Sequence, residues 1–125
     1  MVFLVDRLAN FAQTGSLREA PSSIQDELRR AAFNWMGCAV GGSQNDAVAI
    51  ALRAVEVISG PTQASVLGRA AKLDCSNTAF INCIASSVDA FDDTDSTMML
   101  HPTSLVCVAR LSRLTRRAMA SSLRC

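Results

Sequence analysis

Apolar residues recur every three or four positions along most of this chain, the spacing of one face of an α-helix. The first such segment predicts a helix that ends near Thr14-Gly15. A second helix is predicted to open at Pro21, where Ser22 and Gln25 have the spacing of a capping box. It should end at Gly41-Gly42, where glycine can supply a left-handed C-terminal residue. The apolar positions of the two segments are Val2, Leu4, Val5, Leu8 and Phe11, and then Ile24, Leu28, Ala31, Ala32, Trp35, Met36 and Val40.

The end of the second predicted helix, residues 33–40, is apolar on nearly every side, which indicates burial against several neighbours. Gly37 and Ala39 would let another backbone come close. We therefore expect one core that this helix shares with later segments. Its predicted members are Trp35, Met36, Ile81, Ile84 and Leu105.

Three further helices and one short extended piece are predicted downstream. A third helix should start within residues 43–46 and run to Gly60-Pro61, and residues 64–69 read as an extended segment with at most a trivial strand. Asp74 or Ser76 should cap a fourth helix, and a fifth should start at Thr103. No internal repeat or long linker divides the chain, so the predicted fold is a single all-α helical bundle.

Composition narrows the classes of partner. The 125 residues carry a net charge of +1, so no overall field attracts nucleic acid or a membrane surface, and no apolar run is long enough to span a bilayer. The five cysteines show no zinc-site spacing. We expect an intracellular protein, cytoplasmic or mitochondrial, because the N-terminus shows no clear targeting signal.

The most chemically suggestive segment is residues 87–103, which reads S-V-D-A-F-D-D-T-D-S-T-M-M-L-H-P-T. It contains four aspartates within seven positions and the only histidine, His101. Crowded carboxylates repel one another unless donors or cations lie among them, so such clusters occur at metal sites, acid/base sites and helix N-termini. A capped, solvated turn between two helices explains the same residues. The four aspartates are Asp89, Asp92, Asp93 and Asp95.

Several segments, in order, resemble the N-terminal helical part of the MmgE/PrpD family, which includes 2-methylcitrate dehydratase and cis-aconitate decarboxylase. Residues 8–11 (L-A-N-F) resemble its opening helix, 34–39 (N-W-M-G-C-A) its buried helix, and 60–68 the short extended segment that follows. The more specific match is 77–82 (N-T-A-F-I-N) leading to F-D-D-T at 91–94 and H-P-T at 101–103.

This resemblance implies a lyase that removes water or carbon dioxide from a tricarboxylate-like small molecule without a redox cofactor. Carried over by position, His101, Asp92, Asp93 and Thr94 are candidate catalytic residues, and Asp89 and Thr103 are candidate substrate-binding residues. The family usually has an acid directly before the aromatic residue of the signature, where this chain has Ala90.

The resemblance is expected to cover residues 1–108 as an incomplete N-terminal helical domain, with 109–125 as a basic tail outside it. That tail holds five arginines and no acid. Because the family's other catalytic residues lie in later sequence, we expect a truncated lyase that is inactive alone.

Two other functions stay open. Asp92-Asp93-Thr94-Asp95 resembles a short magnesium motif for diphosphate chemistry, since Mg²⁺ prefers carboxylate oxygens. Alternatively, the chain is a non-catalytic helical interaction module or remnant whose exposed apolar faces favour a homodimer or other self-association.

Overall fold

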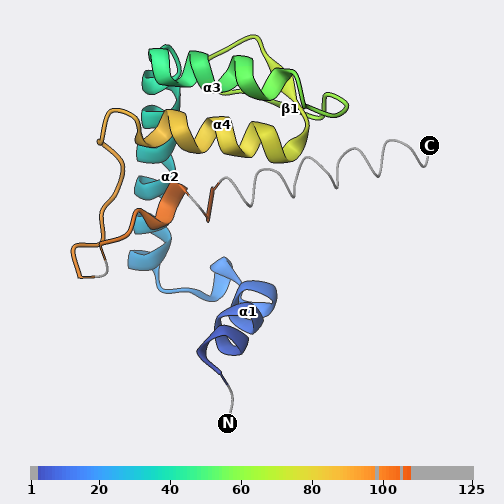
Figure 1. The fold of residues 1–125 in the computed structure, drawn as a ribbon. Helices are drawn as coiled ribbons and strands as arrows, with labels where there is room; N and C mark the ends of the chain where they lie inside the picture. The colour runs from blue at the N-terminus through green and yellow to red at the C-terminus, as the bar shows by residue number, and fades with distance from the viewer. Residues whose placement is uncertain (1–2, 98, 105, 108–125) are drawn as a thin grey trace. The chain divides into compact units, whose positions relative to one another are not determined.

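The computed structural model describes residues 3–97, 99–104 and 106–107 (Figure 1). The described elements are α1 (Leu4–Thr14), a short 3₁₀ helix (Leu17–Glu19), α2 (Ser22–Gly42), α3 (Asp46–Glu56), β1 (Ala64–Ser65), β2 (Lys72–Leu73) and α4 (Cys75–Ser87). Residues 102–104 and 106–107 are also helical. The chain divides into two compact units, 1–30 and 31–125.

The first unit contains α1, the 3₁₀ helix and the start of α2. Helix α1 ends at Thr14, as the sequence predicts, and the Gly15 N–H donates to the Phe11 carbonyl. The predicted capping box at Ser22 is wrong. The N–H groups of Ile24 and Gln25 donate to the Pro21 carbonyl, and the Gln25 side chain donates to the Ala20 carbonyl instead of returning to Ser22.

In the second unit, α3 and α4 lie side by side, and the β1–β2 hairpin packs on α4 (Figure 1). The strands are antiparallel, with Ala64 opposite Leu73 and Ser65 opposite Lys72. Asn82 on α4 holds the hairpin, because its Oδ1 accepts from the Leu67 N–H at 2.9 Å. The buried core joins these elements. Its members are Val48, Leu52, Val55, Val66, Leu73, Ile81 and Ala85, with Ala51, Ala71, Ile84 and Val88 packed against it.

Asp74 caps α4, one of the two residues that the sequence offered for this role. Its Oδ1 accepts from the backbone N–H groups of Ser76 and Asn77, and its Oδ2 accepts from the Ser59 hydroxyl, the Gly60 N–H and the Asn77 amide. These donors stabilise the charged carboxylate and hold the pKa of Asp74 far below its usual range. One side chain therefore fixes both the start of α4 and the loop that precedes the hairpin.

The contact between α2 and α4 is made at Gly42. A Cβ on Gly42 would overlap the Ala85 carbonyl oxygen and lie 2.7 Å from Val88 Cγ1. Gly37, which the sequence suggested as the point of close approach, has open space at its Cβ position. The predicted left-handed cap at Gly41-Gly42 is also wrong, because among the described glycines Gly68 is the one with positive φ.

Gly68 lies in the hairpin turn, with φ of 73°, where the chain meets the end of α2. The Gln44 amide donates to the Gly68 carbonyl at 2.9 Å, and Arg69 Nε donates to the Ser43 carbonyl at 2.6 Å. A cationic donor is favourable here because the last carbonyls of a helix carry partial negative charge.

The predicted core is only partly correct. Trp35, Ile81 and Ile84 are buried or half-buried, but Met36 is exposed and Leu105 lies outside the described residues. The expectation that residues 33–40 are covered on every side is also wrong. Helix α4 and the loop after it cover one side of α2, which buries Trp35, Ala39 and Gly42 and leaves the opposite side uncovered by the described residues. Exposed there are Phe33, Met36 and Val40.

The third helix ends at Glu56, four residues before the predicted end, while the small strand near Val66 is as expected. The fifth helix is already helical at Pro102, one residue before the predicted start. None of the helices in the described ranges is both long and apolar enough to cross a membrane. The basic segment 109–125 lies outside the described residues.

Candidate functional site

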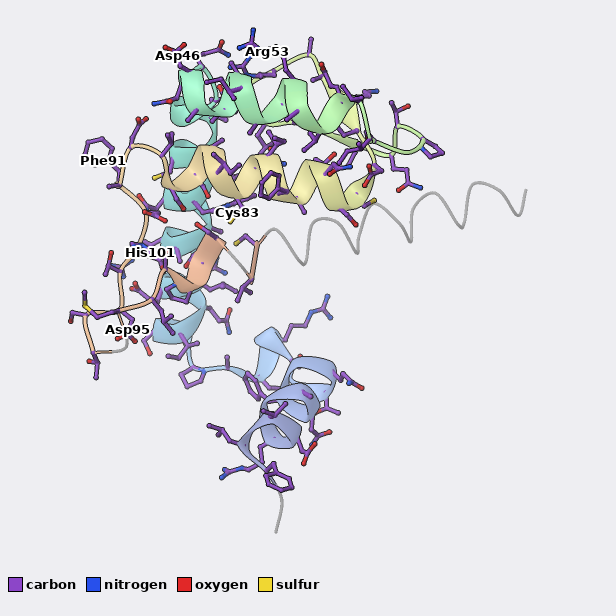
Figure 2. The ribbon with its side chains drawn as sticks, in the orientation of Figure 1. Asp46, Arg53, Cys83, Phe91, Asp95 and His101 are labelled. Atoms are coloured by element: carbon purple, nitrogen blue, oxygen red, sulfur yellow. The ribbon has the colours of Figure 1, made fainter. Side chains whose placement is uncertain are left out.

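The acidic segment leaves α4 and runs along α2 to the helix that starts at Pro102 (Figure 2). The Asn34 amide donates to the Phe91 carbonyl at 3.3 Å, which ties this loop to α2. Phe91 itself is 78% exposed and lies at the outer edge of the loop, while His101 lies beside α2 (Figure 2). Ala90, the residue before Phe91, has φ of 55°, a left-handed conformation that is unfavourable for alanine.

Asp92 is the buried member of the cluster, with a side chain that is only 2% exposed. Its Oδ2 accepts from the Ser87 hydroxyl at 2.8 Å and more distantly from the Ser104 hydroxyl at 3.5 Å. The same oxygen lies 3.4 Å from His101 Nδ1. A buried carboxylate needs such partners, because removing it from water without them is costly.

His101 is half-exposed, and its Nδ1 faces the loop interior. Nδ1 lies 3.1 Å from the Asp93 carbonyl oxygen and 3.4 Å from Thr94 Oγ1. A carbonyl oxygen can only accept, so this contact requires the proton on Nδ1. In the neutral imidazole, Nε2 then carries the lone pair and is the nitrogen able to accept a proton.

The other candidate residues support the loop in different ways. The Asp93 carboxylate accepts from the Thr103 hydroxyl at 2.7 Å, which links the aspartate pair to the start of the last described helix. Asp89 is more remote from the histidine contacts, since its Oδ1 accepts from the Asn45 amide at 3.5 Å at the start of α3. Asp95 bends the loop by accepting from the Thr97 N–H. The structure thus joins His101, Asp92, Asp93 and Thr94 directly, and Thr103 through Asp93.

Three half-buried thiols lie near enough to the acids for the carboxylate charges to act on them. Burial raises the pKa of Cys38, Cys83 and Cys107, and the negative charge of Asp92 raises the pKa of Cys38 and Cys83 further. Asp93 does the same for Cys107. A raised pKa keeps these thiols protonated and weakly nucleophilic near neutral pH.

The carboxylates do not gather as a metal site requires. Across the described residues, no group of three or more His, Cys, Asp or Glu side chains is placed to hold a metal ion. Asp92, Asp93 and Asp95 instead bind donors in three different places. The arrangement gives no support to magnesium-dependent diphosphate chemistry.

Sequence reasoning missed two contributors to this site. Ser87 and Ser104 hold the buried carboxylate, and Ser86 lies 3.0 Å from Ser104 through their hydroxyls. No local pattern singles out these serines, because their role depends on the end of α4 meeting the last described helix.

The order of these elements and the loop signature can be compared with known families. The MmgE/PrpD N-terminal domain matches residues 6–120. The chain belongs to the MmgE/PrpD family. Searches of curated proteins and of solved structures gave no match.

Membership in the MmgE/PrpD family confirms the resemblance drawn from the sequence and the expected all-α class of its N-terminal domain. The match extends to residue 120 and so includes part of the arginine-rich segment that follows residue 108. In this MmgE/PrpD chain, the F-D-D-T and H-P motifs are brought together by the loop after α4.

Proposed function

We propose that this chain supplies the acid/base centre of a lyase that removes water or carbon dioxide from a tricarboxylate-like substrate, of the 2-methylcitrate dehydratase or cis-aconitate decarboxylase type. The observation that carries this proposal is the orientation of His101, whose Nδ1 faces the Asp93 carbonyl at 3.1 Å and Asp92 Oδ2 at 3.4 Å. This orientation leaves Nε2 as the proton-exchanging atom of a half-exposed ring.

Both reactions need a proton transfer that one imidazole can perform. In a dehydration, Nε2 takes a proton from the carbon beside a carboxylate, and the hydroxyl on the neighbouring carbon leaves as water after protonation by a second donor. In a decarboxylation, the imidazolium gives its proton to the carbanion left when carbon dioxide departs. In either case the imidazolium is stabilised by the Asp92 carboxylate, which lies beside its Nδ1.

Asp93 and Thr94 have supporting roles in this proposal. The Asp93 backbone fixes the histidine tautomer, while its side chain anchors the last described helix through Thr103. Thr94 Oγ1 lies 3.4 Å from Nδ1 and is exposed, so its hydroxyl is available to a substrate carboxylate.

Among the described residues, no lysine or arginine forms an ion pair with Asp89, Asp92 or Asp93, so none is shown in place for a tricarboxylate; the arginine ion pairs lie within α2. Stabilisation of developing charge is usually a large part of catalysis, so the cations have to come from outside this site. We therefore expect the 125-residue chain alone to turn over neither 2-methylcitrate nor cis-aconitate.

A chimera tests the acid/base role directly. Residues 6–120 would replace the matching segment of an active lyase of this family, and turnover would be measured with His101 intact and as His101→Ala. We expect kcat to fall on the order of 10²-fold or more, the scale of a positioned acid/base. Thr97→Ala, an exposed change in the same loop, is the matched control and should keep kcat within about twofold. Near-normal kcat in an active His101→Ala chimera would exclude the proposed role.

The uncovered side of α2 favours self-association as a second, non-catalytic function. Phe33, Met36 and Val40 are 73%, 45% and 52% exposed, and Gly37 and Gly41 beside them have open space at their Cβ positions. An apolar helix face of this kind can bury itself against a second copy.

Sedimentation of the isolated chain tests this second function. Phe33→Glu should shift the chain toward monomer, since it places a charge in the proposed interface. Ile50→Glu changes another exposed apolar residue, on α3, and should leave the oligomeric state unchanged. A chain that is monomeric without either change would rule out self-association through this face.

A further inference from the structure

Two buried side-chain polar atoms in the described residues have no hydrogen-bond partner, Trp35 Nε1 and Asp92 Oδ1. They are chemically complementary, because an indole N–H can only donate and a carboxylate oxygen can only accept. Buried polar groups in folded proteins are almost always paired, either directly or through an enclosed water molecule. An unpaired donor and an unpaired acceptor in one compact unit could therefore satisfy each other.

The contacts around α2 bring the two residues to the same turn of that helix. The Asn34 amide donates to the Phe91 carbonyl. Asn34 precedes Trp35 and Phe91 precedes Asp92 in the sequence, so this hydrogen bond brings the two neighbourhoods together. Cys38 lies one turn further along α2, and the charge of Asp92 contributes to its raised thiol pKa. Asp92 is therefore close to the stretch 34–38, where Trp35 is 97% buried.

We propose that the Trp35 N–H is the missing donor for Asp92 Oδ1, through one enclosed water molecule, and that Trp35, Asp92 and His101 form one chain of hydrogen bonds. With both carboxylate oxygens held, Asp92 keeps one rotamer, and its Oδ2 stays directed at His101 Nδ1. Trp35 is then a positioning residue for the acid/base centre; that catalytic meaning rests on the proposed function, whereas the hydrogen-bonded chain does not.

The composition of the chain makes this testable without turnover. Trp35 is the only tryptophan and His101 the only histidine of the 125 residues, so a nuclear magnetic resonance spectrum contains one indole N–H signal, and every histidine ring signal belongs to His101. The experiment records the indole N–H signal and its exchange with solvent in the unchanged 125-residue chain and in three variants. The variants are Asp92→Asn, Asp92→Ala and Asp93→Asn. Asp93→Asn is the matched control, because its carboxylate is already bound by Thr103.

We expect Asp92→Ala to move the indole signal upfield and to lower its exchange protection by about tenfold or more, because the water that binds the indole N–H loses the charged acceptor that holds it in place. Asp92→Asn should have a smaller effect in the same direction, and Asp93→Asn should leave the signal in place. Equal effects of the Asp92 and Asp93 changes, or an indole N–H that exchanges freely in the unchanged chain, would overturn the proposal.

If the Asp92 variants fail to fold, Trp35→Phe tests the same series of hydrogen bonds from the tryptophan side. Phenylalanine keeps a buried aromatic ring, smaller than the indole, and removes the donor, so the His101 ring signals should shift. Phe33→Leu, an exposed change on α2, is its control and should not move them. Unchanged His101 signals in folded Trp35→Phe would also overturn the proposal, whatever the outcome of the activity assays.

Discussion

Two adjacent glycines at the end of α2 allow the packing of α2 against α4, the helix that leads into the candidate site, to be measured directly. Gly41 is exposed with open space at its Cβ position, whereas Gly42 is buried against the Ala85 carbonyl and Val88. We therefore compare Gly41→Ala with Gly42→Ala. The change in side chain is identical and the positions are neighbours, so differences in helix propensity largely cancel.

The expected magnitude follows from the two environments. At Gly41 the added methyl meets nothing within 4 Å, and alanine in place of glycine should stabilise the helix by at most about 1 kcal/mol. At Gly42 the methyl overlaps a backbone carbonyl, which cannot rotate away as a long side chain can. Overpacking of this kind costs roughly 1–3 kcal/mol, so Gly42→Ala should be less stable than Gly41→Ala by about that amount.

Urea unfolding followed by circular dichroism measures this difference, and thermal unfolding should separate the two variants by about 4 °C for each kcal/mol in a chain of 125 residues. A second readout is the His101 ring signals, because the loop after α4 should move with the end of that helix. Equal stability of the two variants would show that α2 and α4 do not meet at Gly42, and an unmoved His101 signal in a destabilised Gly42→Ala would separate helix packing from site geometry.

Three further predictions concern the supports of the site. Asn82→Ala should destabilise the chain by about 1–3 kcal/mol in urea unfolding, because it removes a buried side chain and leaves the half-buried Leu67 N–H of the hairpin without its acceptor, whereas exposed Ser76→Ala should be near neutral. The lowered pKa of Asp74 means that its stabilising effect is full above the usual aspartate pKa of about 4 and is lost as the pH falls below it, so the stability gap to Asp74→Asn should shrink on acidification; a gap independent of pH would contradict this. Ala90→Gly should raise stability by about 0.5–1 kcal/mol because it relieves a left-handed alanine, while Ala54→Gly in α3 should lower it by a similar amount; the same sign for both would refute the strain.

The sequence by itself determined the features that depend on neighbouring residues. The 3.6-residue period located α1, α2 and α4, and a carboxylate before an apolar helical run identified Asp74 as one of two candidate caps. The signature F-D-D-T with H-P pointed to the family, which the match over residues 6–120 confirms, and it predicted that acid/base chemistry lies in the loop after α4. These features are readable because helix periodicity, caps and motifs are written over short stretches of chain.

Only the tertiary structure decided which side of each helix is covered and which of several similar residues bears a contact. Gly37 and Gly42 both lie on α2, but only Gly42 meets another backbone, because the side on which α4 packs is set by residues far away in the sequence. Asp92 and Asp93 are neighbours of the same type, yet Asp92 is buried beside His101 while Asp93 binds Thr103. A carboxylate's role follows from its burial and its donors, and those are supplied by Ser87 at the end of α4 and Ser104 in the next helix.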